Sequence, residues 1–107
     1  MRNIALPAVF ASLVLLAGAM CAPAGEPASV VIADLEFKPP VVTVRIGDTV
    51  TWINRDFVEH TATSRDGVFD VATPKARPAR WRAQKAGDFS YYCRLHPNMT
   101  GIIRVTR

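Results

Sequence analysis

The chain has 107 residues, the length of a single domain, and half of its residues are hydrophobic. Its 13 Lys and Arg outnumber 9 Asp and Glu, which gives a net charge of +4. The basic residues gather between Lys75 and Lys85 with one aromatic residue, Trp81, among them, a pattern of a solvated strand face and loop rather than a nucleic-acid surface.

The first 24 residues predict a secretory signal peptide. A short positive start is followed by an apolar run from Ile4 to Ala19, and Ala22-Pro23-Ala24 fits a cleavage site. The run is shorter than the ~20 residues that a spanning helix needs, and no later stretch is apolar enough, so no membrane-spanning segment is expected. Cleavage would leave residues 25–107 as one domain in the periplasm. Cys21 does not follow the Gly or Ala that normally precedes a lipidated Cys, so a lipid anchor is not expected.

The remaining chain reads as short strands separated by turns. Alternation of apolar and polar residues, and enrichment in Val, Ile, Thr and aromatic residues, predict seven strands at 29–37, 41–46, 49–54, 60–64, 79–84, 88–93 and 101–106. Gly47-Asp48 and Arg65-Asp66-Gly67 are turn signals, and the apolar segment Val68 to Val71 fits no state clearly. No helical period is present. We therefore predict an all-β, antiparallel sandwich with Greek-key connections.

The alternation also assigns faces to two of these strands. Val50, Trp52 and Asn54 share one face of their strand, and Tyr91 and Cys93 share a face of another. If Trp52 faces the core, Asn54 does too, and its amide needs hydrogen-bond partners there. The same parity places the sulfur of Cys93 at the end of the core.

The chemistry of the chain is concentrated in the segment from Cys93 to Met99. A thiolate, an imidazole and a thioether stand at Cys93, His96 and Met99, and His60 is the one other imidazole. Two His, one Cys and a weak axial Met form the ligand set of a blue-copper site. After the leader is removed, the domain has no further Cys, Met or His, so every residue of these types belongs to the predicted site. Singly, each residue would fit an ordinary place in a β-protein core, and thioether is a poor ligand for zinc.

The order His60, Cys93-x-x-His96-x-x-Met99 resembles the cupredoxins, and the short gap between His96 and Met99 resembles their amicyanin branch. Gly47 to Arg55 and Ala86 to Cys93 also resemble amicyanin segments, so the similarity covers most of residues 29 to 107.

The resemblance implies a cupredoxin-like fold with one type 1 copper that alternates between Cu(I) and Cu(II). It also implies that Asn54 ties the strand that bears His60 to the chain just after Cys93. Pro97 restricts the backbone of the ligand loop, which limits how far that loop can relax. Arg94 stands where amicyanins have Thr, Glu59 replaces Pro, and Thr61 replaces Asn.

The function expected from this resemblance is that of a one-electron carrier and not an enzyme. Such a carrier would act as a monomer and dock weakly onto redox proteins such as a cytochrome c or a dehydrogenase. Leu95 would contribute to an apolar patch around His96, and Arg94 would favour an acidic partner. A periplasmic module that scavenges or delivers copper is the alternative, and the ligands alone do not separate the two.

Overall fold

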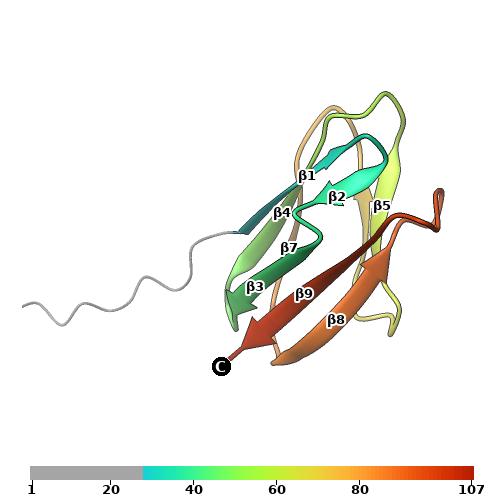
Figure 1. Ribbon diagram of the computed structural model, residues 1–107. Helices are drawn as coiled ribbons and strands as arrows, with labels where there is room; N and C mark the ends of the chain where they lie inside the picture. Colours follow the sequence, from blue (N-terminus) through green and yellow to red (C-terminus); the bar gives the residue numbers. More distant parts are fainter. Residues whose placement is uncertain (1–27) are drawn as a thin grey trace, which may run out of the picture.

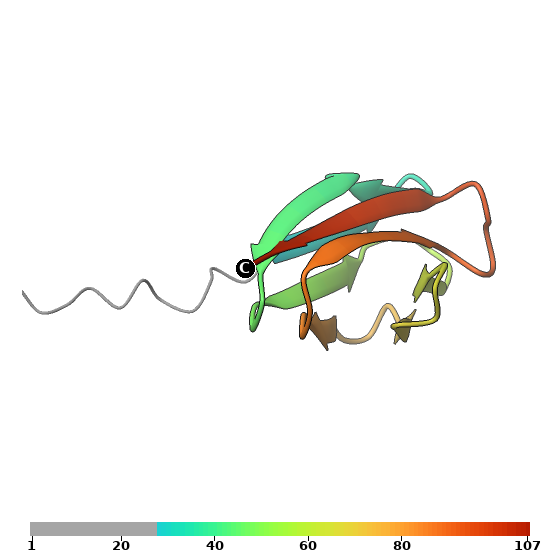
Figure 2. The ribbon, with the colours of Figure 1, turned by 90° about the horizontal axis from the view of Figure 1, so that it is seen from below.

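The protein folds into two β-sheets that enclose one core. The computed structural model describes residues 28–107, so the predicted signal peptide and Cys21 lie outside the described residues. Nine strands follow in chain order: β1 (Ala28–Ala33), β2 (Glu36–Lys38), β3 (Val41–Arg45), β4 (Thr49–Asn54), β5 (His60–Ser64), β6 (Asp70–Thr73), β7 (Ala79–Arg82), β8 (Gly87–Tyr92) and β9 (Thr100–Thr106). Figures 1 and 2 show these strands surrounding a single interior.

One sheet has four strands in the order β2-β1-β4-β7, and the other has five in the order β3-β9-β8-β5-β6. The prediction of an all-β sandwich is confirmed, but the expectation of antiparallel strands was wrong in two pairs, because β1 lies parallel to β4 and β3 lies parallel to β9. Parallel neighbours need a long connection between them. Here the chain from β1 to β4 passes through β3 in the other sheet, and β9 is the last strand to join β3.

Two strands more than predicted are present. The segment 29–37 is not one strand, because Asp34 and Leu35 adopt positive φ values of 55° and 57° and turn the chain back, so that β1 and β2 pair as a hairpin. A two-residue turn with both φ values positive matches the twist of the strands it joins. The apolar segment after Gly67 leads into β6, which pairs with β5.

The core confirms the alternation read from the sequence. Val50 and Trp52 in β4 are fully buried, Tyr91 in β8 is 1% exposed, and Asn54 is buried with them. Ile46, which continues the apolar alternation of β3, is exposed instead because the strand has already ended at Arg45. Within residues 28–107, no helix is long and apolar enough to cross a membrane.

Three connections meet at one end of the sandwich. They are the β1–β2 turn, the β4–β5 loop at residues 55–59 and the β8–β9 loop at residues 93–99. In Figure 1 the β8–β9 loop projects from the end of its sheet that lies opposite the labelled C-terminus. Every residue that the sequence predicted to bind metal belongs to, or borders, one of these loops.

Candidate metal centre

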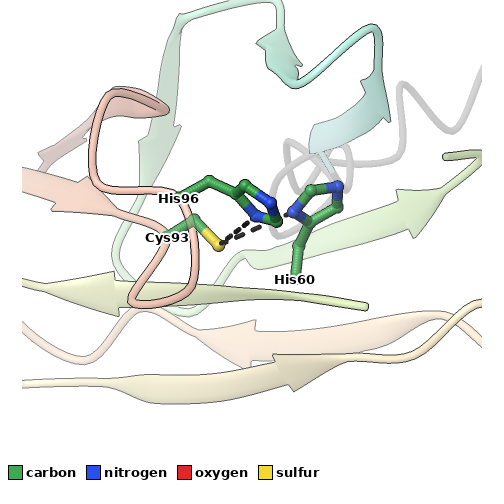
Figure 3. Close-up of side chains that lie close together, drawn as sticks. All are labelled: His60, Cys93 and His96. Atoms are coloured by element: carbon green, nitrogen blue, oxygen red, sulfur yellow. Dashed lines mark hydrogen bonds between the residues drawn. The ribbon is translucent and has the colours of Figure 1, made fainter. Parts of the chain in front are cut away.

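His60, Cys93 and His96 converge at this end of the sandwich. Cys93 Sγ lies 3.6 Å from His60 Nδ1 and 4.0 Å from His96 Nδ1, and the ligand atoms of the three residues all lie within 4.8 Å of one another. Figure 3 shows Cys93 and His96 on one loop, with His60 approaching from a separate strand. Cys93 and His60 are buried, whereas His96 is partly exposed.

These separations are those that one metal ion requires. Imidazole nitrogen and thiolate sulfur bind a first-row metal such as zinc at about 2.0–2.3 Å. Two such ligands at trigonal or tetrahedral angles therefore stand about 3.5–3.8 Å apart, close to the observed sulfur-to-nitrogen distances of 3.6 and 4.0 Å. The set of one thiolate and two imidazoles, with a thioether nearby, matches copper in softness. The residues present therefore fit one copper ion.

Met99 is held beside this cluster by the backbone of its loop. Cys93 N donates a hydrogen bond to Met99 O at 3.1 Å, and Met99 N donates to His96 O at 2.9 Å. These two bonds close the loop into a tight turn, and Met99 is buried at its base with 3% of its surface exposed. The loop thus carries three of the four predicted ligands and joins Met99 to Cys93 and His96 through its own backbone.

His60 is oriented by a carboxylate that the sequence analysis missed. Its Nε2 donates to Asp56 Oδ2 at 2.8 Å, so the lone pair of the neutral ring is on Nδ1, the atom that faces Cys93. Burial raises the pKa of Asp56, but the hydrogen bonds from the His60 ring and from Leu35 N outweigh it, and the pKa lies below the ordinary value of 3.8. Asp56 therefore remains an ionised acceptor at neutral pH. An acid in a short loop has no periodic signal that could have indicated this role.

The contact predicted for Asn54 is made by Thr61 instead. Thr61 Oγ1 accepts a hydrogen bond from Arg94 N at 2.9 Å, just after Cys93, and Thr61 N donates to Cys93 Sγ at 3.4 Å. The expectation for Asn54 was wrong because its side chain belongs to β4, which lies in the other sheet from β5 and β8. The sequence signal for this contact was the Thr at position 61, where amicyanins have Asn.

Asn54 organises the loop that leads to His60. Its amide nitrogen donates to Val58 O and to Thr73 O, each at 2.9 Å, and its Oδ1 accepts from Asp56 N at 2.9 Å. The buried amide is therefore fully used, as its burial requires. Because it holds Asp56 in place, Asn54 acts on the metal centre through the carboxylate that orients His60.

The remaining residues of the ligand loop form its outer surface. Leu95 is 57% exposed, and Arg94 and Pro97 are exposed beside the partly exposed His96 ring. A hollow next to this ring is lined by Leu35, Leu95, His96, Pro97, Asn98 and Met99. The fold thus presents one edge of a ligand imidazole at a surface with apolar side chains around it.

Comparison with known proteins agrees with this geometry. No family model matches the chain. Amicyanin-alpha of Methylorubrum extorquens is 34% identical over 110 aligned residues, which cover 94% of this chain and 92% of the relative. The chain belongs to the amicyanin family. Amicyanin of Paracoccus denitrificans is 36% identical over 81 residues, which span 69% of this chain and 61% of that relative.

Solved structures extend the match of this amicyanin-family chain to three dimensions. A reduced amicyanin with a proline-to-phenylalanine substitution superposes with a TM-score of 0.67 at 31% identity, covering 75% of this chain and 82% of that one. A methionine-to-alanine variant of amicyanin in its Cu(I) form gives the same TM-score. The copper-containing nitrite reductase of Thermus scotoductus also superposes, with a TM-score of 0.66 at 31% identity, but this chain covers 23% of its length. The cupredoxin fold is therefore found in enzymes as well.

Proposed function

We propose that this protein is a periplasmic electron carrier that holds one copper ion through His60, Cys93, His96 and, as a weak axial ligand, Met99. When bound, the copper supplies a one-electron couple between Cu(I) and Cu(II). The observation that carries the proposal is the convergence of one thiolate and two imidazole Nδ1 atoms within 4.8 Å at a largely buried site.

The surroundings of the ligands favour electron transfer over release of the metal. His60 is fixed by Asp56, Cys93 receives the Thr61 amide, and the ligand loop is closed by its own backbone bonds. Ligands held this rigidly change position little when the charge of the metal changes, so the exchange of an electron requires little rearrangement. Copper delivery would instead require that the buried Cys93 and His60 release the ion. The chain contains two His in total, so no further His is left for a second, catalytic copper site.

The exposed surface around His96 supports weak docking of redox proteins. Four exposed apolar side chains lie in the loops at this end, namely Leu35, Phe57, Val58 and Leu95. Arg94 adds a guanidinium beside them that is half exposed and bonded through Nε to Asp70. Apolar contact around the imidazole edge with positive charge at its rim fits a transient partner with an acidic surface. We propose a monomer that exchanges electrons with a dehydrogenase and a cytochrome c.

Visible absorption tests the site directly. The purified domain loaded with Cu(II) is expected to show the intense charge-transfer band of a copper thiolate, because Cys93 is the sole thiol of residues 25–107. Cys93→Ser should abolish the band, whereas Met99→Ala should retain it with an altered reduction potential, since the axial ligand only tunes the copper. A folded, copper-loaded protein without the band would contradict the proposal. Fast electron self-exchange would support the carrier, and rapid loss of Cu(I) to a chelator would favour delivery.

Docking through Arg94 is tested by charge reversal. With hexacyanoferrate(III) as an anionic probe, Arg94→Glu should slow oxidation of the reduced protein severalfold at low salt. The part of the difference that fades near 1 M salt, where the Debye length is about 3 Å, reports electrostatic steering, whereas any part that persists reports the lost hydrogen bond from Arg94 Nε to Asp70. Arg104→Glu makes the same change of net charge on β9, where Arg104 faces Asp88 at 4.0 Å. Equal slowing by both variants would show that net charge alone steers the probe.

A further inference from the structure

β5 buries polar side chains on the face that points away from the core. Ala62 packs into the core, so Thr61 and Thr63 lie on the opposite face, yet they are only 6% and 8% exposed. A buried hydroxyl without a partner costs about 1–3 kcal/mol. Thr61 and Thr63 therefore need hydrogen-bond partners on this face of β5.

The two hydroxyls belong to a closed ring of hydrogen bonds. Thr63 Oγ1 donates to Asp70 Oδ1 at 2.8 Å, and Thr61 Oγ1 lies 3.0 Å from Thr63 Oγ1. Arg94 closes the ring through two of its atoms. Its backbone N donates to Thr61 Oγ1 at 2.9 Å, and its side-chain Nε donates to Asp70 Oδ1 at 3.2 Å.

The direction of every bond in the ring is determined by chemistry. The hydrogen bond from Thr63 lowers the pKa of Asp70, and Arg94 adds to this, so the carboxylate is ionised and can only accept. Thr63 must then donate its one hydroxyl hydrogen to Asp70 and accept from Thr61. Thr61 in turn accepts the Arg94 amide. Each donor therefore has one acceptor within the ring, which the half-exposed pair of Arg94 and Asp70 closes at the surface.

The ring controls where the amide of Thr61 points. Thr61 N donates to Cys93 Sγ at 3.4 Å, and the side chain of the same residue is bonded to Arg94, the residue after Cys93. Thr61 therefore holds the Cys93 sulfur through its backbone N and the next residue of the chain, Arg94, through its hydroxyl. If the ring opens at Thr63, the hydroxyl of Thr61 loses its acceptor, and the hydrogen bond from Arg94 N to Thr61 Oγ1 is the one ring contact left between residues 61 and 94.

We propose that Thr63, Asp70 and Arg94 are positioning residues that hold the Thr61 amide against the Cys93 sulfur and thereby tune the reduction potential of the copper. This inference rests on the proposed function. An N–H donor at a thiolate withdraws negative charge from the sulfur, which weakens its donation to Cu(II) and favours Cu(I). Opening the ring therefore lowers the potential.

The main test changes one hydroxyl and no charge. Thr63→Val keeps the shape of the side chain and removes the link to Asp70, whereas Thr63→Ser keeps the hydroxyl. At a fixed applied potential, Thr63→Val should shift the ratio of Cu(II) to Cu(I) severalfold towards Cu(II), with tenfold corresponding to about 59 mV. Thr63→Ser should remain near the wild-type ratio.

A second measurement needs no copper. In the metal-free protein, hydrogen exchange of the Thr61 amide, followed by NMR, should be faster in Asp70→Ala than in the wild type. Asp88→Ala is the matched control, because Asp88 is also exposed and faces an Arg, Arg104, but lies at the start of β8 away from the ring. Should Thr63→Val fail to fold, Asp70→Ala and Thr63→Ser still test the ring.

The outcomes separate the inference from the proposed function. If the wild-type protein shows the copper thiolate band and Thr63→Val has the same potential as Thr63→Ser, the positioning role alone would be overturned. So would an unchanged exchange rate of the Thr61 amide in Asp70→Ala. A wild-type protein that forms no copper thiolate band would overturn both proposals. Three results together would support the ring. They are a lower potential in Thr63→Val, a potential near that of the wild type in Thr63→Ser, and faster exchange of the Thr61 amide in Asp70→Ala.

Discussion

The tautomer of the His60 ring decides which of its two nitrogens can bind a metal. A neutral imidazole can carry its proton on either nitrogen, and only the unprotonated nitrogen can bind an ion. Asp56 resolves this choice, because its carboxylate accepts from Nε2 and leaves the lone pair on Nδ1, facing Cys93. Asp56 also accepts from Leu35 N at 3.1 Å, so the same carboxylate joins the β1–β2 turn to the metal centre.

Removal of this carboxylate should therefore weaken metal binding without unfolding the protein. We expect Asp56→Ala to lower copper affinity about 10–100-fold, the usual effect of removing the hydrogen-bond partner of a ligating His. Competition with a chelator of known affinity measures the change. Asp66→Ala is the control, since Asp66 Oδ1 also accepts from a backbone amide, that of Val68 at 3.1 Å, but has no contact with a ligand. Equal affinities of the two variants would contradict a role for Asp56 in orienting His60.

The ligands and their supporting residues differ in how far the sequence can reveal them. Cys93, His96 and Met99 could be predicted because rare residue types stand at a short fixed spacing, and His60 because it is the one other His. Asp56 and Thr61 are common residue types, and their roles depend on which loops meet in space. The sequence carries no local pattern for such a meeting, which is why the supporting contact was assigned to Asn54.

At the scale of elements, β8 and β9 pack closely because of a glycine. Gly101 lies opposite Tyr91 in the antiparallel pair, and a Cβ at Gly101 would lie 2.5–2.6 Å from the Tyr91 ring. The ring is 1% exposed, and its Oη lies 3.3 Å from Trp52 Nε1, so it cannot move away freely. Burial raises the pKa of Tyr91 to about 12, and the hydrogen bond from Trp52 only partly offsets this, so the hydroxyl stays neutral.

Gly101→Ala should consequently destabilise the protein by about 1–3 kcal/mol through overpacking. Urea unfolding of the metal-free protein measures the loss. A double-mutant cycle with Tyr91→Phe, which removes the Oη at 2.6 Å from the new methyl group, should show coupling between the two positions. Gly67→Ala is the comparison, because nothing lies within 4 Å of its Cβ and its cost comes from a φ of +79° alone. Its effect should be additive with Tyr91→Phe. Additivity at Gly101 as well would show that Oη takes no part in the clash, and a loss below about 1 kcal/mol in Gly101→Ala would refute the clash with the ring carbons.

The pattern of apolar and polar residues predicted most strands, but it did not predict the turn between β1 and β2 or the edge strand β6. Alternation identified β4 with the observed bounds, and the loop at residues 55–59 and the turn at Arg65-Asp66-Gly67 delimited β5. The β1–β2 turn was missed because Asp34-Leu35 has neither Gly nor Asn, the residues that usually supply two positive φ values. β6 gives no clear strand signal because it is a short edge strand with one buried residue, Thr73.

At the scale of the molecule, the metal centre closes one end of a small core. The ligands come from the start of β5, the end of β8 and the loop that leads into β9, three neighbouring strands of the five-stranded sheet. Asp56 and Leu35 extend the contacts to loops that leave the four-stranded sheet. A domain of about 80 residues buries a modest fraction of its surface, so a bound ion at this junction contributes noticeably to its stability.

Copper should therefore stabilise the fold in proportion to its binding. An ion that binds only the folded state adds about 2.7 kcal/mol when its free concentration is 100 times the Kd, and each further tenfold rise adds about 1.4 kcal/mol. Residual binding of Cu(I) by the free thiol of the unfolded chain would reduce this gain. Urea unfolding under anaerobic conditions, with Cu(I) buffered at several free concentrations, measures the increment. His60→Ala is the informative variant because it keeps Cys93, and with it the thiol of the unfolded chain, while it removes the one ligand from outside the β8–β9 loop. The gain should be much smaller in that variant; an equal gain would mean that the loop alone holds the ion and that the junction between strands contributes nothing.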